Sequence, residues 1–129
     1  MNADTREWVL FAEADFDAAK TLFRRRSNTT LNAVGFHCQQ CIEKYLKARL
    51  AEAGMQIPKV HDLMLLLQRL LPYEPLWASF APALRGINDY AVKFRYPGST
   101  ATRADIRQLL KVCRSIRGEV RQSLGLPKK

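Results

Sequence analysis

The sequence contains few acidic residues, few histidines and no long apolar segment. Among 129 residues, 21 are Lys or Arg and only 12 are Asp or Glu, for a net charge of +9. Such a basic chain attracts polyanions, or an acidic protein partner, through a field that salt weakens. No apolar stretch approaches the roughly 20 residues that a bilayer span needs, and residues 1–13 lack the pattern of a secretory signal. We therefore expect a cytoplasmic protein with no membrane association.

The length corresponds to one domain, and no repeat, low-complexity tract or linker interrupts the chain. We expect a single helical domain over residues 1–129, with its core at about 4–124 and a short basic tail at 125–129.

Cysteine is also scarce, with three residues in the chain. An odd number in a chain of this size argues against a disulfide framework. Cys38 and Cys41 have the spacing of redox and metal motifs, but the other histidine and cysteine ligands that a zinc site would need lie far along the chain. The pair falls within a predicted helix, on the same line as Val34 and Tyr45. We predict core packing for both cysteines, with no metal site and no cofactor.

Apolar residues recur every three or four positions in five segments, which predicts an all-α, up-and-down bundle without strands. The expected helices cover 4–26, 30–53, 62–71, 82 to the Tyr96-Pro97-Gly98 exit, and a last one from 102, with a short helical piece at 76–81.

Three helix starts have side chains that can satisfy free backbone N–H groups. Asp4 with Glu7 is predicted to cap the first helix, Asp62 the third, and Thr102 with Asp105 the fifth.

The second and fourth helices have more apolar positions than one inward line needs. Ile42, Leu46 and Leu50 lie beside the line formed by Cys38, Cys41 and Tyr45. We predict that some of this surface pairs with a second copy of the chain in a homodimer.

The second helix has a polar face formed by His37, Gln40, Lys44 and Lys47, which are spaced three, four and three residues apart. One interpretation is a solvated face. The other is the polar wall of a cleft or dimer seam, because histidine, glutamine and lysine can bind phosphates and base edges.

The fifth helix has a basic ridge, offset by roughly 100° from its apolar line and therefore predicted to be exposed. The ridge consists of Arg103, Arg107, Lys111, Arg114, Arg117 and Arg121. It is interpreted either as a solvated surface or as a contact with nucleic acid or an acidic partner. It lacks aromatic residues that would stack bases, which argues against specific single-strand binding.

Several segments together resemble the HEPN family of small helical-bundle proteins. Residues 36–48 (FHCQQCIEKYLKA) are similar to the family pattern F-H-x-Q-Q-x-x-E-K-x-L-K-A, residues 59–63 (KVHDL) to K-x-H-D-L, and residues 95–97 to R-Y-P. The opening W-x3-A-x2-D-F-x2-A over 8–19 is also similar.

The resemblance implies a bundle of about five helices, usually dimeric, with a polar cleft. It implies either a partner of a separate minimal nucleotidyltransferase, in a toxin-antitoxin-like pair, or a metal-independent ribonuclease. The ribonucleases share an R-x(4–6)-H motif, in which arginine stabilises phosphate charge and histidine moves a proton. Neither His37 nor His61 follows an arginine at that spacing.

Our hypothesis is therefore a non-catalytic, homodimeric module that associates with a nucleotide or RNA and docks a nucleotidyltransferase. Its expected ligand-binding residues are His37, Gln40, Lys44, Lys59, His61, Arg95 and Tyr96. Two alternatives stay open. One is a divergent ribonuclease toxin that uses His37 or His61 with Arg95, and the other is a purely structural dimer.

Overall fold

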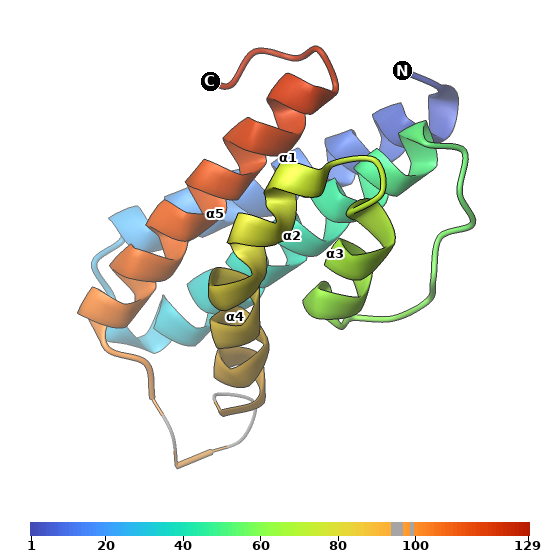
Figure 1. Cartoon of the computed structure of the whole chain (residues 1–129). Helices are drawn as coiled ribbons and strands as arrows, with labels where there is room; N and C mark the ends of the chain where they lie inside the picture. The colour runs from blue at the N-terminus through green and yellow to red at the C-terminus, as the bar shows by residue number, and fades with distance from the viewer. Residues whose placement is uncertain (94–96, 99) are drawn as a thin grey trace.

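The computed structural model describes residues 1–93, 97–98 and 100–129, and Figure 1 shows the arrangement of its helices. Five α-helices and two 3₁₀ helices follow one another, and the described residues form no strand. They are α1 (Ala3–Arg24), η1 (Asn28–Thr30), α2 (Leu31–Glu52), α3 (Leu63–Leu70), η2 (Pro75–Phe80), α4 (Ala81–Lys93) and α5 (Arg103–Ser123). This confirms the all-α, five-helix prediction.

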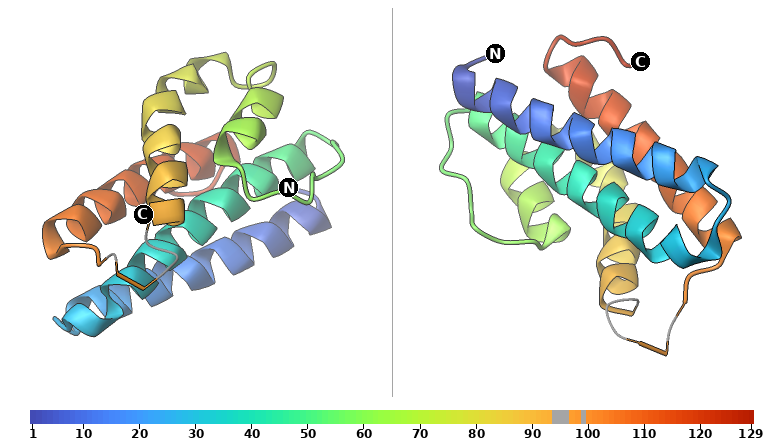
Figure 2. Two further views of the ribbon diagram at one scale, coloured as in Figure 1. Left: turned by 90° about the horizontal axis from the view of Figure 1, so that it is seen from below. Right: turned by 180° about the vertical axis from the view of Figure 1, so that it is seen from behind.

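The long helices α1 and α2 form an antiparallel pair, and α2 is the centre of the bundle. It packs against α1, α3, α4 and α5, and thirteen of its 22 residues are buried. In Figure 2 the outer side of α1 is not covered by another helix, whereas α3, α4 and α5 lie on the other side of the pair.

The apolar surface of α2 that suggested a dimer is buried within one chain. Ile42, Leu46 and Leu50 are 1 % exposed or less. They lie in a single core with residues of the other helices. The argument for pairing through these three residues is therefore wrong, because the shorter helices α3 and α4 add neighbours that α1 and α5 alone would not provide.

The predicted core positions of the cysteines are confirmed. Cys38, Cys41 and Cys113 are fully buried and free, and the Cys113 thiol lies 3.7 Å from the Cys38 carbonyl oxygen. A hydrogen bond with Cys113, together with burial, raises the pKa of the Cys38 and Cys41 thiols. They stay protonated at neutral pH and fill space between α2 and α5.

Two of the three predicted helix caps are confirmed. Asp62 Oδ1 accepts from the Met64 amide at 2.9 Å. Thr102 and Asp105 form the reciprocal capping box of α5.

The cap predicted for α1 is wrong, because the helix begins at Ala3 and Asn2 is its N-cap. Asn2 Oδ1 accepts from the Thr5 amide at 2.8 Å. Its Nδ2 donates to the Ala51 carbonyl oxygen at 2.9 Å, so the N-cap residue also joins the start of α1 to the end of α2.

The connections follow the proline and glycine positions. Pro82 lies in the first turn of α4, where its missing N–H costs no hydrogen bond. Gly98 has φ +100°, a left-handed conformation that suits glycine, so the chain turns at Pro97–Gly98 as predicted. Tyr96 and Arg95 lie outside the described residues. No helix in the described part of the chain is both long enough and apolar enough to cross a bilayer.

Candidate functional site

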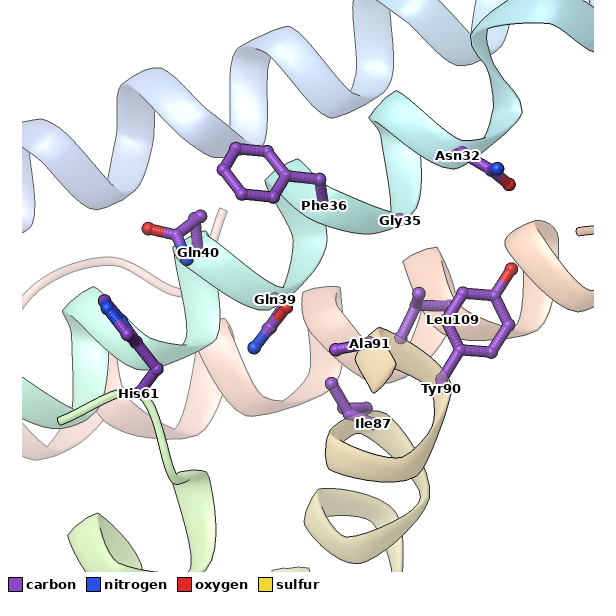
Figure 3. Close-up of a pocket in the computed structure, with 10 residues that line it drawn as sticks. All are labelled: Asn32, Gly35, Phe36, Gln39, Gln40, His61, Ile87, Tyr90, Ala91 and Leu109. Carbon is purple, nitrogen blue, oxygen red and sulfur yellow. The ribbon is translucent and has the colours of Figure 1, made fainter. Parts of the chain in front are cut away.

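A cavity of about 570 Å³ lies where α2, α4 and α5 meet the segment that leads into α3. Figure 3 shows the side chains around it. Its lining residues are Asn32, Gly35, Phe36, Gln39, Gln40, His61, Ile87, Tyr90, Ala91 and Leu109.

The cavity has an apolar side and a polar side. Ile87 and Ala91 of α4 and Leu109 of α5 supply apolar surface, whereas α2 supplies the amide groups of its lining. The α2 residues recur at steps of three and four along the chain, which places them on one side of the helix. The result is a pocket with an apolar surface and a few polar groups, the usual composition of small-molecule sites.

Gly35 brings α4 and α5 close to α2 beside this cavity. A Cβ atom at this position would lie 3.2 Å from the Tyr90 ring and 3.3 Å from Ile106 Cδ1. The absence of a side chain therefore permits Tyr90 to approach α2. Burial, helped by the charge of Asp105, raises the pKa of Tyr90 to about 12, so its hydroxyl is neutral at physiological pH.

His61 is oriented by a buried carboxylate. Glu43 is 3 % exposed, and its two carboxylate oxygens lie 3.0 and 3.2 Å from His61 Nδ1. Lys47 Nζ donates to Glu43 Oε2 at 3.2 Å and lies 5.5 Å from the centroid of the Trp8 ring. Because Nδ1 is occupied by Glu43, Nε2 is the His61 atom left for a ligand.

His37 and Lys44 form a second cluster that joins α1 to α2. Asp15 is buried, and its carboxylate lies 2.8 Å from His37 Nδ1 and 2.5 Å from Lys44 Nζ. Neither His37 nor Lys44 lines the cavity.

The predicted polar face of α2 is therefore divided among three environments. His37 and Lys44 bind Asp15, Gln40 lines the cavity, and Lys47 is buried beside Glu43. A uniformly solvated face is wrong, because Lys47 is only 6 % exposed. Helical spacing predicted that these residues share a face. It could not show that α1 and the segment leading into α3 cover parts of that face.

Only part of the predicted ligand set meets at the cavity. Gln40 and His61 line it, whereas Lys59 is exposed two residues before His61 and is not part of the lining. Arg95 and Tyr96 lie outside the described residues.

Other residues of the site were missed by the sequence analysis. Asn32 and Phe36 lie eight and four residues before Gln40, on the same side of the helix. This spacing from Gln40 was a signal that could have found both. The sequence contained no such signal for Tyr90, since its position beside α2 depends on how α4 packs against α2.

The predicted exposure of the basic ridge is wrong for its C-terminal part. Arg117 is 7 % exposed and binds Glu13 through two hydrogen bonds, Nε to Oε2 at 2.7 Å and Nη2 to Oε1 at 2.6 Å. Arg121 donates to the Tyr45 hydroxyl at 3.1 Å. Side chains from this half of α5 thus reach Glu13 on α1, a contact that helical periodicity does not reveal.

The remaining ridge is exposed at Arg107, Lys111 and Arg114, while Arg103 is half-buried against Phe23. The ridge therefore has two parts. Its N-terminal part is largely exposed, and Arg117 and Arg121 in its C-terminal part form ion pairs with α1.

The comparison with known families agrees with the sequence resemblance. The HEPN domain family matches residues 5–123, from the first turn of α1 to the end of α5. No curated protein and no solved structure matches the chain. A match of this extent, on an all-helical bundle that keeps the quoted motifs, shows the family: the chain belongs to the HEPN domain family.

Proposed function

We propose that this HEPN domain is a nucleotide-binding module and the partner of a minimal nucleotidyltransferase in a toxin-antitoxin-like pair. The observation that supports the binding function is the cavity of about 570 Å³ with amide groups and His61 around an apolar surface. That composition suits a nucleobase, which has two apolar faces and an edge of donors and acceptors.

The amides of α2 supply the groups that recognise a base edge. Within the described part of the chain, the Gln39 and Gln40 side chains make no hydrogen bond to protein. Asn32 Oδ1 accepts from the Ala101 amide at 3.2 Å, which leaves its NH₂ group for a ligand. Asn and Gln each pair a donor with an acceptor in the geometry that matches adenine and other base edges.

An aromatic ring lies at the edge of the cavity. Phe36 is 56 % exposed and contacts the His37 ring edge-on, with 5.4 Å between centroids. An exposed ring that is already held on one side is a surface on which a base can stack.

The phosphate end of the nucleotide is assigned to the His61 side of the cavity. The His61 side chain is 79 % exposed, and Lys59 is two residues before it. The charge of Glu43 is offset by Lys47, so the carboxylate orients His61 without leaving net negative charge there. Arg95 and Tyr96 stay predicted ligand-binding residues. His37 and Lys44 contribute to the site indirectly, because their contacts with Asp15 position α2 against α1.

Thermal unfolding with ATP, GTP, CTP and UTP tests this function. A ligand that binds only the folded state stabilises it by about 2.7 kcal/mol at a hundredfold excess over its Kd, or roughly 10 °C in melting temperature for this length. We expect such a rise for at least one nucleotide. Gln40→Ala should weaken its binding tenfold to a hundredfold, since a bidentate amide contact contributes about 1–3 kcal/mol.

Gln68→Ala is the matched control, because Gln68 is an exposed α3 glutamine that does not line the cavity. Unchanged melting temperatures with all four nucleotides would contradict the binding function. The orientation of His61 by Glu43 is the observation that favours the ribonuclease alternative. Cleavage of RNA by the pure protein, abolished in His61→Ala with the fold intact, would establish that alternative instead.

Dimerisation and docking of the nucleotidyltransferase are predicted on the uncovered side of α1. Leu10 and Phe11 on α1 are 69 % and 51 % exposed and give this side an exposed apolar surface. Light scattering should give the mass of two chains, and a larger mass after mixing with a nucleotidyltransferase encoded beside this gene. The mass of one chain at micromolar concentration would contradict the dimer.

A further inference from the structure

A second hollow, of about 590 Å³, lies between the C-terminal end of α1 and the first turns of α5. Its lining residues are Phe23, Arg24, Arg26, Arg103 and Arg107. Four of these five are arginines, and none is acidic. Arg24 and Arg26, at the end of α1 and just after it, are about 80 positions from Arg103 and Arg107, so only the fold brings the two pairs together.

Phe23 holds this arginine cluster in place. Its carbonyl oxygen accepts from Arg103 Nη2 at 2.6 Å and from the Arg26 amide at 3.4 Å. Its ring lies 4.2 Å from the Arg103 guanidinium and 5.9 Å from that of Arg107. These contacts offset part of the repulsion between the Arg103 and Arg107 guanidinium groups and keep the two near one another.

The chain turns back at this point through a conformation unusual for a non-glycine residue. Arg26 has φ +55°, in the left-handed region. Such a conformation costs free energy and persists where surrounding contacts favour it. Here it places a further arginine beside the hollow.

The charge of this cluster is not neutralised by any ion pair in the described part of the chain. Among the described residues, no carboxylate lies within ion-pair distance of Arg24, Arg26, Arg103 or Arg107. Arg117 and Arg121, at the other end of the same helix, share Glu13. Positive charge at the end of α1 and at Arg103 and Arg107 of α5 is therefore without an ion-pair partner, whereas Arg117 and Arg121 have one in Glu13.

The cationic row continues beyond the hollow through Lys111 and Arg114, which are also exposed and without a carboxylate partner in the described structure. Arg103 to Arg114 is eleven residues, or roughly 16 Å along a helix. Phosphates of one strand in a duplex are spaced about 3.4 Å apart along the axis, so the row spans about five of them. A single phosphate group would use only a fraction of these cations, whereas a repeating polyanion would use all of them.

We propose that this arginine groove, formed by the hollow together with Lys111 and Arg114, binds the phosphodiester backbone of a nucleic acid. The planar guanidinium forks contact two phosphate oxygens at once, and the absence of acidic residues from the hollow favours a ligand of high negative charge. The groove shares no lining residue with the nucleotide cavity. This inference therefore holds or fails independently of the proposed function.

The test is a salt titration of binding to labelled 20-base-pair RNA and DNA duplexes of mixed sequence, followed by fluorescence polarisation between 50 and 200 mM salt. The groove variant combines Arg24→Gln, Arg26→Gln and Arg107→Gln, three exposed side chains without a hydrogen bond to protein in the described structure. The control variant combines Arg6→Gln, Arg69→Gln and Arg85→Gln, which are exposed and outside the groove. Both lower the net charge of +9 by three.

We expect the groove variant to bind at least tenfold more weakly at 50 mM salt. Its slope of log affinity against log salt should fall by about 3, because each of the three lost phosphate contacts removes about 0.9 for a duplex. The control variant should keep the wild-type slope and bind within threefold of wild type. The RNA and DNA arms identify which backbone the groove prefers.

Three results would overturn the proposal: no binding of either nucleic acid by wild type at 50 mM salt, equal weakening in both variants, or equally tight binding of polyglutamate of the same charge. The last would make the groove a site for acidic proteins. The groove variant should keep any nucleotide-induced rise in melting temperature, because its three substitutions lie outside the cavity lining. Failure of the groove is thereby distinguished from failure of the cavity.

Discussion

Replacing Glu43 by leucine is expected to lower the free energy of unfolding by about 3–5 kcal/mol, since it leaves a buried cation without its partner. Lys47 is 6 % exposed, and its ammonium group donates to the Glu43 carboxylate at 3.2 Å. With leucine at position 43, the Lys47 ammonium lacks a counter-charge in a region shielded from water. Urea denaturation at pH 7 measures the loss.

The double variant Glu43→Leu with Lys47→Met is the control for this prediction. Replacing both members of a buried ion pair by apolar side chains is often neutral or stabilising. We expect the double variant to recover most of the stability that Glu43→Leu loses. A loss below about 1 kcal/mol in the single variant would show that Lys47 moves out to water and that the pair is not buried in solution.

The second large effect is expected at Glu13, which joins α1 to α5 through Arg117 and Arg121. Glu13→Gln leaves the buried Arg117 guanidinium without a counter-charge. Because the Glu13 side chain is 32 % exposed, we expect a cost of about 2–3 kcal/mol at pH 7, below that of a fully buried pair. Urea denaturation of wild type and variant at pH 7, 5 and 3 measures both the cost and its pH dependence.

The pH dependence follows from the Glu13 carboxylate. Burial opposes its ionisation, but hydrogen bonds from Arg117 and Tyr45 outweigh burial and lower the pKa of Glu13 below its usual value. A lowered folded-state pKa contributes stability above the unfolded-state pKa, about 4.3, and this stability is lost as pH falls through the folded-state pKa. The difference between wild type and Glu13→Gln should therefore be full at pH 7 and narrow at pH 3.

Glu119→Gln is the control for the Glu13 experiment. Glu119 pairs with Lys128 at 3.2 Å, but both side chains are about half exposed. A surface pair of this kind contributes between zero and 1 kcal/mol. If the Glu13 difference is the same at pH 3 as at pH 7, the stabilising role of its charge is wrong.

The sequence alone determined the helices and most of their ends, because these depend on residues that are near one another in the chain. Thr102 with Asp105 and the Asp62 side chain satisfy amides within three residues, and both caps are confirmed. The apolar line of α5 is likewise buried at Ile106, Cys113 and Val120, as its spacing predicted. The family resemblance also came from short motifs in these helices.

The tertiary structure decided how the helix surfaces are used. Helical spacing shows which residues share a face, but the neighbour that covers each part of that face depends on how the helices cross. Glu13 on α1 therefore pairs with the C-terminal end of the basic ridge, and Asp15 on α1 binds His37 and Lys44, which do not line the cavity. For the same reason, Arg24 and Arg107 line one hollow only in the folded chain, because both α1 and α5 pack against α2.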